Sequence, residues 1–290
     1  MPAHADARDV PGLTLTCGPH VLDLARPRVM GIVNATPDSF SDGGRFPDHA
    51  GALAHARQLL ADGADIVDVG GESTRPGAAP VSDAEEMDRV LPVIEALARD
   101  GAIVSVDTMK PSVMRAAVAA GAAMINDVRA LQAPGALEAA ASTHAAICLM
   151  HMRGAPATMQ QAPHYDDVVG EVRAFLVARA QACERAGIAR DRIVVDPGFG
   201  FGKTARHNFT LLRELAAFVD TGYPVLCGWS RKSSLGAVTG RDTGERLAAS
   251  LAAALASVAR GASIVRVHDV RETVDALKVW QAAGAPRAAR

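Results

Sequence analysis

The chain has 290 residues, of which 49% are hydrophobic and 21% charged, so it can bury a sizeable core and is not of disordered composition. Thirty Lys and Arg residues against 32 Asp and Glu residues give a net charge of −2, which argues against a general basic surface for nucleic acid. The longest uncharged apolar stretch, 247–259, is shorter than the ~18 residues of a membrane span, and residues 1–9 lack a signal-peptide core, so we expect a cytoplasmic protein.

Short β-branched runs alternate with alanine-rich helical stretches along the chain. Before the first run, 13–18 and 20–24 alternate apolar and polar residues around Gly18 and Pro19, which predicts a small β-hairpin at the floor of the fold. Eight runs typical of buried parallel strands follow. The predicted strands are 29–34, 66–70, 103–107, 124–128, 147–151, 193–196, 225–229 and 264–268. The predicted helices are 48–62, 83–99, 111–120, 134–142, 166–186, 205–219, 243–260 and 269–281.

Eight β/α units in about 250 residues are typical of a single (β/α)8 barrel, the TIM-barrel architecture. A doubly wound sheet is the alternative, but it usually carries a glycine-rich motif after its first strand, and 34–38 has none. We predict one α/β barrel domain over 13–282, with flexible termini at 1–12 and 283–290. The cysteines form no CxxC pair and are expected to be buried reduced thiols. They are Cys17, Cys148, Cys183 and Cys227.

The carboxyl ends of the predicted strands carry most of the polar residues, and active groups gather at these ends in such barrels. The first βα loop is long and polar, and Asn34 at its start offers a neutral oxygen suited to a hard cation such as Mg²⁺. In the second loop, Arg75 stands between Thr74 and Pro76. Its guanidinium is suited to clamping a phosphate, with a surface ion pair as the alternative.

The last predicted strand places Arg266 and His268 on one side, because they are two residues apart. They indicate an anion site in the barrel mouth, or else a core arginine paired within the protein. Acceptor-bearing side chains end three other strands and suit either a flat heterocycle with several N–H groups or a metal. These acceptors are Asp107, Asn126 and Asp196.

The loop after Asp196 is rich in glycine, so its backbone can approach a planar ligand, on which Phe201 is placed to stack. Lys232, after the seventh strand, is suited to hydrogen-bonding a ligand carbonyl or ring nitrogen. A Schiff base or a solvated lysine are its alternatives. Met150, at the end of the fifth strand, is a candidate for a flexible apolar wall.

Eight segments at consecutive strand ends together resemble the dihydropteroate synthase family, from residue 13 to residue 280. They are MGIVNATPDSFSDGG (30–44), GGESTRPGA (70–78), SVDT (105–108), INDV (125–128), LMHMRGAPATMQQAPHYDDVV (149–169), DPGFGFGK (196–203), GWSRKS (228–233) and RVHDV (266–270). The resemblance implies a pterin-binding barrel that condenses 6-hydroxymethyl-7,8-dihydropterin pyrophosphate with 4-aminobenzoate, giving 7,8-dihydropteroate and pyrophosphate. It also implies Mg²⁺ as cofactor and a homodimer formed through exterior helices.

The resemblance further assigns the site residues. The implied pterin pocket comprises Asp107, Asn126, Val128, Met150, Asp196, Gly228 and Lys232. The implied pyrophosphate site comprises Asn34 (through Mg²⁺), Arg75, Arg266 and His268. The implied 4-aminobenzoate site comprises Thr74, Pro76, Phe201, Ser230 and Lys232. Catalytic roles fall to Asp107, Asp196, Lys232, Arg266 and His268: the carboxylates stabilise a methylene cation, and Arg266 and His268 stabilise the departing diphosphate.

Three other functions compete with this one. A pterin-binding methyltransferase domain shares the acceptors but has no need for Arg75, Arg266 and His268. A noncatalytic paralogue should have lost Lys232, Arg266 or the second loop. A Schiff-base aldolase would use Lys232 as its nucleophile. Pyrophosphate release that depends on 4-aminobenzoate separates all four.

Overall fold

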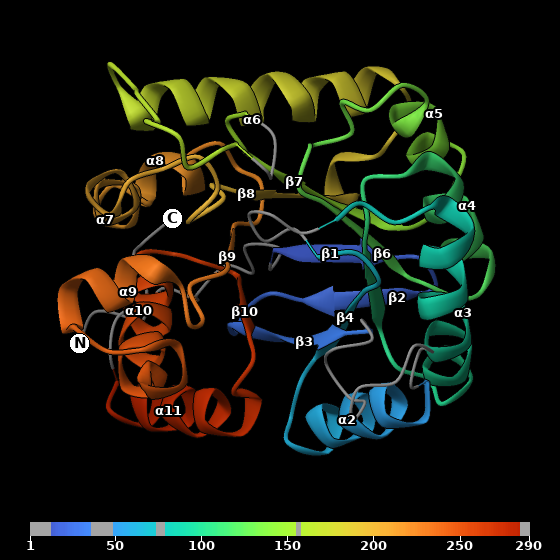
Figure 1. The fold of residues 1–290 in the computed structure, drawn as a ribbon, viewed down its shortest axis with the longest axis horizontal. Helices are drawn as coiled ribbons and strands as arrows, with labels where there is room; N and C mark the ends of the chain where they lie inside the picture. Colours follow the sequence, from blue (N-terminus) through green and yellow to red (C-terminus); the bar gives the residue numbers. More distant parts are fainter. Residues whose placement is uncertain (1–12, 36–48, 74–78, 155–157, 285–290) are drawn as a thin grey trace, which may run out of the picture.

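A computed structural model describes residues 13–35, 49–73, 79–154 and 158–284. Eight parallel strands form a barrel surrounded by helices, and a two-stranded hairpin precedes it (Figure 1). The barrel strands are β3 (Arg28–Asn34), β4 (Ile66–Gly70), β5 (Val104–Asp107), β6 (Met124–Asp127), β7 (Ala146–Met150), β8 (Ile193–Asp196), β9 (Leu226–Cys227) and β10 (Ile264–Val267). The predicted (β/α)8 barrel is thus confirmed.

The ring of strands closes between β8 and β9, the two ends of the hydrogen-bonded order. Hydrogen-bonded neighbours run in the order β8-β7-β6-β5-β4-β3-β10-β9. Strand β8 then meets the start of β9 through a parallel bridge between Val195 and Val225 and a 3.0 Å bond from the Val195 N–H to the Pro224 carbonyl. Because all the pairs are parallel, the carboxyl ends of the strands share one rim, as the pairing of Asn34 with Gly70 shows.

Helices cover the outside of the ring (Figure 1). They are α2 (His49–Ala61), α3 (Asp83–Arg99), α4 (Pro111–Ala119), α5 (Ala136–Ala141), α6 (Val168–Arg185), α7 (Ala205–Arg213), α8 (Ala216–Val219), α9 (Ser233–Thr239), α10 (Leu247–Ala259) and α11 (Val270–Ala282). Local capping fixes several starts: the Ser82 hydroxyl accepts the Glu85 N–H, and the Asp167 carboxylate accepts the N–H groups of Val169 and Gly170.

Three helical predictions differ from the structure. The single helix predicted over 205–219 is two helices, α7 and α8, separated at residues 214–215, where no glycine or proline signals a break. The helix predicted over 243–260 is a short 3₁₀ turn (Thr243–Glu245) followed by α10, with Arg246 turning its guanidinium back to the Arg241 carbonyl. Helix α9 was not predicted, because its seven residues, SSLGAVT, carry little helical periodicity.

The period of two along each strand divides the core into two parts. Val265 and Val267 of β10 face the helices, in the large core between strands and helices. Ile264 faces the barrel interior, where it belongs to a separate cluster with the hairpin residues Leu15 and Leu22. The predicted hairpin, β1 (Thr14–Cys17) with β2 (His20–Asp23), therefore closes the amino-terminal end of the barrel.

The described helices include none that is long and apolar enough to cross a membrane. Strand β9 is shorter than the predicted run 225–229, since only Leu226 and Cys227 join the ladder to β10. Beyond these residues the chain turns out of the sheet through Arg231, whose φ is +58°. The termini predicted to be flexible lie outside the described residues, apart from 283–284.

Candidate active site

An arginine and two aspartates meet inside the carboxyl rim of the barrel. Arg266 Nε lies 2.6 Å from Asp68 Oδ2, and its Nη2 lies 2.8 Å from Asp107 Oδ2. The Asn126 amide donates to the same Asp68 oxygen over 3.0 Å. The arrangement ties β10 to β4, β5 and β6. Of the two interpretations left open by the sequence, a core arginine paired within the protein describes Arg266 in this structure.

Asp68 was missed by the sequence analysis, which took 66–70 as an ordinary buried strand. The side chain is fully buried, and its Oδ1 has no partner among the described residues. A carboxylate in the middle of an apolar parallel strand is the signal that was available, because buried charges are rare unless paired. Its place two residues before Gly70 puts it directly below the mouth.

Burial governs the ionisation of the aspartates at this rim. Burial raises the pKa of Asp107 to about 7, with the charge of Asp68 adding to the shift and the charge of Arg266 opposing it. Burial likewise raises the pKa of Asp196 to about 6, against the Gly198 N–H, which donates to Asp196 over 2.7 Å, and against Lys232. Both acids therefore titrate close to neutral pH, as functional carboxylates often do.

Lys232 and Phe201 come together above Asp196. The Lys232 ammonium lies 4.2 Å from the centre of the Phe201 ring, a cation–π distance. A side chain at Gly200 would come within 3.2 Å of Lys232 Cδ, so this glycine leaves room for the lysine. Phe201, which is predicted to stack on a ligand, and Lys232, which is predicted to hydrogen-bond one, are thus in contact.

His268 is held by Ser230. The His268 N–H donates to Ser230 Oγ over 3.1 Å, and the imidazole Nδ1 lies 2.9 Å from the same oxygen. Burial, followed by the charges of Arg231 and Arg266, lowers the pKa of His268 to about 4. The ring is therefore neutral at pH 7. The Ser230 hydroxyl can donate to Nδ1 or accept from it, and when it donates, Nε2 carries the ring proton.

The remaining predicted residues fall at the same rim or outside the described residues. Asn34 ends β3 with an exposed side chain. Val128 and Met150 are buried, and a Cβ at Gly228 would lie 3.9 Å from that of Arg266. Thr74, Arg75 and Pro76 lie outside the described residues, as does most of the first βα loop. In the part of the chain that the structure describes, no group of three or more His, Cys, Asp or Glu residues could hold a metal ion.

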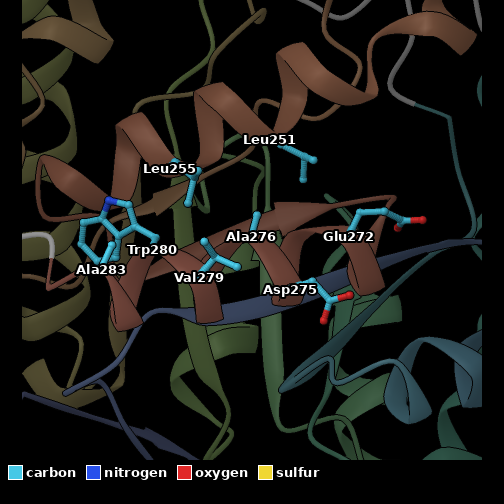
Figure 2. Close-up of a pocket in the computed structure, with 8 residues that line it drawn as sticks. All are labelled: Leu251, Leu255, Glu272, Asp275, Ala276, Val279, Trp280 and Ala283. Atoms are coloured by element: carbon cyan, nitrogen blue, oxygen red, sulfur yellow. The ribbon is translucent and has the colours of Figure 1, made fainter.

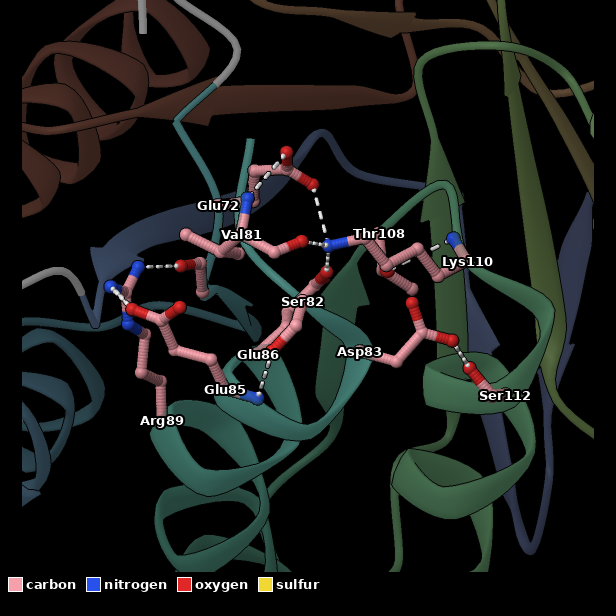
Figure 3. Close-up of polar contacts among 11 residues, drawn as sticks. Glu72, Val81, Ser82, Asp83, Glu85, Glu86, Arg89, Thr108, Lys110 and Ser112 are labelled. Atoms are coloured by element: carbon pink, nitrogen blue, oxygen red, sulfur yellow. Dashed lines mark hydrogen bonds and ion pairs between the residues drawn. The ribbon is translucent and has the colours of Figure 1, made fainter. Parts of the chain in front are cut away.

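A second polar cluster, also missed by the sequence analysis, supports the stems of the second βα loop (Figure 3). The Lys110 ammonium lies 2.6 Å from Glu86, 3.0 Å from Glu72 and 2.7 Å from the Val81 carbonyl. Arg89 Nη1 donates to the Gly71 carbonyl over 2.7 Å. Residues on both sides of 74–78 are therefore bonded to one set of partly buried charged side chains. Lys110, at the centre of this set, lies three residues after Asp107 in the chain.

Comparison with known proteins gives consistent matches over the whole barrel. Residues 30–268 match the family described as pterin binding enzyme. The dihydropteroate synthase of Escherichia coli (strain K12) is 53% identical over 262 residues, which cover 90% of this chain and 93% of that protein. The structure of Xanthomonas albilineans dihydropteroate synthase with 4-aminobenzoic acid is 55% identical, with a TM-score of 0.89 and 95% and 99% of the two chains covered. The same enzyme with 7,8-dihydropteroate is 53% identical, with a TM-score of 0.86 and 94% and 99% covered.

Proposed function

This chain belongs to the pterin-binding enzymes and, within them, to the dihydropteroate synthases, and on that premise we propose how its side chains carry the reaction. The enzyme is a transferase of folate synthesis that joins 6-hydroxymethyl-7,8-dihydropterin pyrophosphate to 4-aminobenzoate. The bond from the exocyclic methylene carbon to pyrophosphate oxygen breaks, a carbon–nitrogen bond forms, and the amine loses a proton. The convergence of Arg266, Asp107 and Asp196 at one rim carries the assignment of roles.

The two aspartates are the groups that we assign to the cation. An aromatic amine is a weak nucleophile, so departure of pyrophosphate runs ahead of attack and leaves positive charge on the methylene and pterin ring. Asp107 and Asp196 accept pterin N–H groups and, when ionised, stabilise this charge in a site of low dielectric. Asn126, with Val128, Met150, Gly228 and Lys232, completes the proposed pterin pocket.

Arg266 and His268 are assigned to the pyrophosphate. A guanidinium has five N–H donors, so the two ion pairs to Asp68 and Asp107 use only part of its capacity. His268 is neutral, so we assign it a hydrogen bond from Nε2–H rather than a positive charge, in the tautomer in which the Ser230 hydroxyl donates to Nδ1. Arg75 has the same role by family resemblance. These donors stabilise the negative charge that develops on the leaving group.

We place 4-aminobenzoate between Phe201, Lys232 and Ser230, with Thr74 and Pro76 from the second loop. The Phe201 ring offers an apolar face to the aromatic ring, and Lys232 beside it offers a positive charge near the carboxylate. The support is the direct contact between these two side chains at the rim. The positions of Thr74 and Pro76 rest on the resemblance alone.

Mg²⁺ fits this site as a companion of the substrate rather than as a resident ion. Asn34 provides a hard, neutral oxygen at the rim, and the described residues hold no acidic cluster that would bind the ion on its own. Mg²⁺ is commonly held by one or two protein oxygens together with substrate phosphates and water. When bound, it would neutralise charge on the pyrophosphate. Asn34→Ala should therefore weaken the Mg²⁺ dependence of pyrophosphate binding in calorimetry, and an unchanged dependence would remove Asn34 from this role.

The activity is tested directly with both substrates. The purified chain, incubated with the pterin pyrophosphate, 4-aminobenzoate and Mg²⁺, should release pyrophosphate and form 7,8-dihydropteroate only when the amine is present. The substitution Arg99→Met, at an exposed position on α3, serves as a control that leaves the rate unchanged. Pyrophosphate release that ignores the amine, or no release with folded protein, contradicts the assignment.

We also propose a homodimer formed through α10 and α11. These helices line an open groove of about 620 Å³ whose walls include Leu251, Leu255, Val279 and Trp280 (Figure 2). Val279 is 71% exposed and lies with Leu251, Leu255 and Trp280 along one apolar groove, and a contiguous exposed apolar surface of this kind marks an interaction site. Val279→Asp should shift the mass measured by light scattering from dimer to monomer, whereas Val238→Asp, equally exposed on α9, should not. A monomeric parent protein contradicts the proposal.

The cytoplasm is the compartment that we propose. All four cysteines are free and buried, as expected for thiols in a reducing compartment. Fractionation of cells that express the untagged chain should recover it with cytosolic markers. Recovery with an exported or membrane fraction would contradict this location.

A further inference from the structure

A buried lysine lies directly beneath the loop that carries Phe201. Lys203 is only 2% exposed, although lysine is almost never buried without partners. Its ammonium lies 2.9 Å from the Gly198 carbonyl, 3.0 Å from the Phe201 carbonyl and 3.1 Å from the His151 carbonyl. The His151 Nδ1 lies 2.9 Å from the same nitrogen. The ammonium therefore stands among four acceptors.

These acceptors come from two separate parts of the chain. His151 directly follows β7, whereas Gly198 and Phe201 belong to the loop after β8. Strands β7 and β8 are neighbours in the barrel, and the His151 N–H continues their ladder to the Asp196 carbonyl over 3.0 Å. The ammonium thus ties the loop to the end of the adjacent strand at three carbonyl groups.

The backbone of this loop is shaped to meet that strand end closely. Gly198 has a φ of +69°, and a Cβ there would come within 2.0 Å of the His151 carbonyl oxygen. Gly202 has a φ of +63°, and a Cβ there would come within 2.4 Å of the Arg153 carbonyl oxygen. Only glycine permits these approaches. They bring carbonyl oxygens together that would repel each other without a donor between them.

The protonation of the neighbours supports a donor role for Lys203. Burial, followed by the charge of Lys203, lowers the pKa of His151 to about 3, so the imidazole is neutral and its Nδ1 can accept. Burial lowers the pKa of Lys203 to about 7, while the charge of Asp196 opposes the shift. An ammonium has three N–H donors and a neutral amine two. The charged form can therefore donate to three of the four acceptors at once, and the neutral amine to only two.

We propose that Lys203 is a positioning residue for 4-aminobenzoate, because it fixes the Phe201 backbone and thereby holds the Phe201 ring against Lys232. The inference rests on the proposed function, which places the amine substrate on that ring. Phe201 also donates its N–H to the Gly198 carbonyl over 3.1 Å. This carbonyl therefore accepts two hydrogen bonds, one from the Phe201 N–H that closes the turn and one from the Lys203 ammonium. Removing the ammonium frees this turn and lets the ring leave its place.

The separate Michaelis constants of the two substrates test the proposal. Lys203→Met keeps the length of the side chain but removes all donors, and we expect KM for 4-aminobenzoate to rise roughly 10- to 30-fold. KM for the pterin pyrophosphate should change less than about threefold, because Asp107, Asn126 and Arg266 come from other strands. Asp196, which accepts the Gly198 N–H, is the pterin residue through which this smaller rise is expected. A variant that merely folds less well has less active enzyme, so its kcat falls and both KM values stay unchanged.

Two controls and a double-mutant cycle complete the test. Arg99→Met controls for the loss of a long cationic side chain at an exposed site, and Leu15→Ala controls for lost stability at the opposite end of the barrel. In a Phe201→Ala background, Lys203→Met should raise KM for 4-aminobenzoate no further, because residues that act as one unit are not additive. If Lys203→Met yields too little folded protein, Lys203→Gln, which keeps two donors, should show the same split at a smaller size.

The outcomes separate this proposal from the proposed function. If Phe201→Ala raises KM for 4-aminobenzoate but Lys203→Met leaves it within twofold, Lys203 is not a positioning residue and the substrate placement stands. Additive effects in the double variant lead to the same rejection. If Phe201→Ala leaves KM unchanged, the placement of 4-aminobenzoate is wrong, and the inference fails with it.

Discussion

Two layers of side chains inside the barrel lie two residues apart along the same strands and differ in chemistry. Residues two apart on a strand face the same side at roughly 6.6 Å separation. Apart from the buried Ser105, which stands two positions before Asp107, the floor layer is apolar and packs against the hairpin. The floor residues Ile66, Met124, Val194 and Ile264 are followed two positions later by the mouth residues Asp68, Asn126, Asp196 and Arg266.

The difference separates what stabilises the fold from what performs the reaction. At the floor, fully buried apolar side chains gain free energy from leaving water, at roughly 25 cal/mol per Å². At the mouth, burial raises the pKa of Asp107 and Asp196, which shows that their charged forms are disfavoured there. Functional sites commonly hold such unfavourable groups because substrate binding uses them. We expect floor variants to alter stability and mouth variants to alter kinetics.

Arg266→Ala should have the largest effect of the variants. Although Arg266 is a mouth residue, its loss should alter both pyrophosphate binding and stability. It removes the guanidinium that we assign to the pyrophosphate, so pyrophosphate affinity should fall by about 2–5 kcal/mol, roughly 30- to 5,000-fold. Because Asp68 is left buried without its cation, the free energy of unfolding should fall as well. Calorimetry with pyrophosphate and urea unfolding measure the two effects, with the exposed Arg271→Ala as control. Unchanged pyrophosphate affinity would remove Arg266 from its proposed role.

Asp107→Asn, a mouth variant, should alter the kinetics and leave the stability nearly unchanged. The amide still accepts a pterin N–H but carries no charge, so the single-turnover rate should fall about 10²- to 10³-fold, the scale of one lost electrostatic stabiliser. The free energy of unfolding at pH 8 should stay within about 1 kcal/mol, since the ionised carboxylate is itself disfavoured by burial. If the rate is unchanged while pterin affinity collapses, Asp107 only recognises the substrate and does not stabilise the cation.

Leu15→Ala should show the opposite behaviour at the floor. Leu15 is fully buried between the hairpin and the barrel strands, so its truncation should lower the free energy of unfolding by about 3 kcal/mol. Both KM values and kcat of the folded enzyme should stay within twofold. Val21→Ala on the exposed face of the same hairpin should leave the unfolding curve in place. A large change in KM for Leu15→Ala would mean that floor and mouth are coupled.

The smallest effect concerns pH. The raised pKa of Asp107, about 7, means that this carboxyl takes up a proton as the pH falls through 7 and then no longer accepts two N–H bonds. Pterin affinity should therefore fall by up to about fivefold between pH 7 and pH 6 in the parent, relative to Asp107→Asn. The comparison cancels titration of the ligand itself. Parallel affinity profiles for the two proteins over pH 5.5–8.5 would show that no titration of Asp107 affects pterin binding in this range, which contradicts the prediction.

Much of the barrel could be predicted from local pattern. The eight apolar runs, the hairpin and most helix starts depend on periodicity and capping within a few residues, which the sequence shows directly. The same reasoning placed Arg266 and His268 on one side of β10. It failed at the boundary between α7 and α8, where no local residue signals the break, and at α9, which is short.

The sequence by itself determined, for every barrel strand except β9, which residues stand near the strand ends, since these strands end close to the end of their apolar runs. Only the tertiary structure decided that Arg266 pairs with Asp68 and Asp107, which lie 198 and 159 positions away in the chain. The same holds for Lys203, whose partner His151 is 52 positions away. The physical reason is that an ion pair depends on distance in space, and closing the ring of strands sets those distances. No local pattern in the sequence shows which distant residues the closed ring brings together.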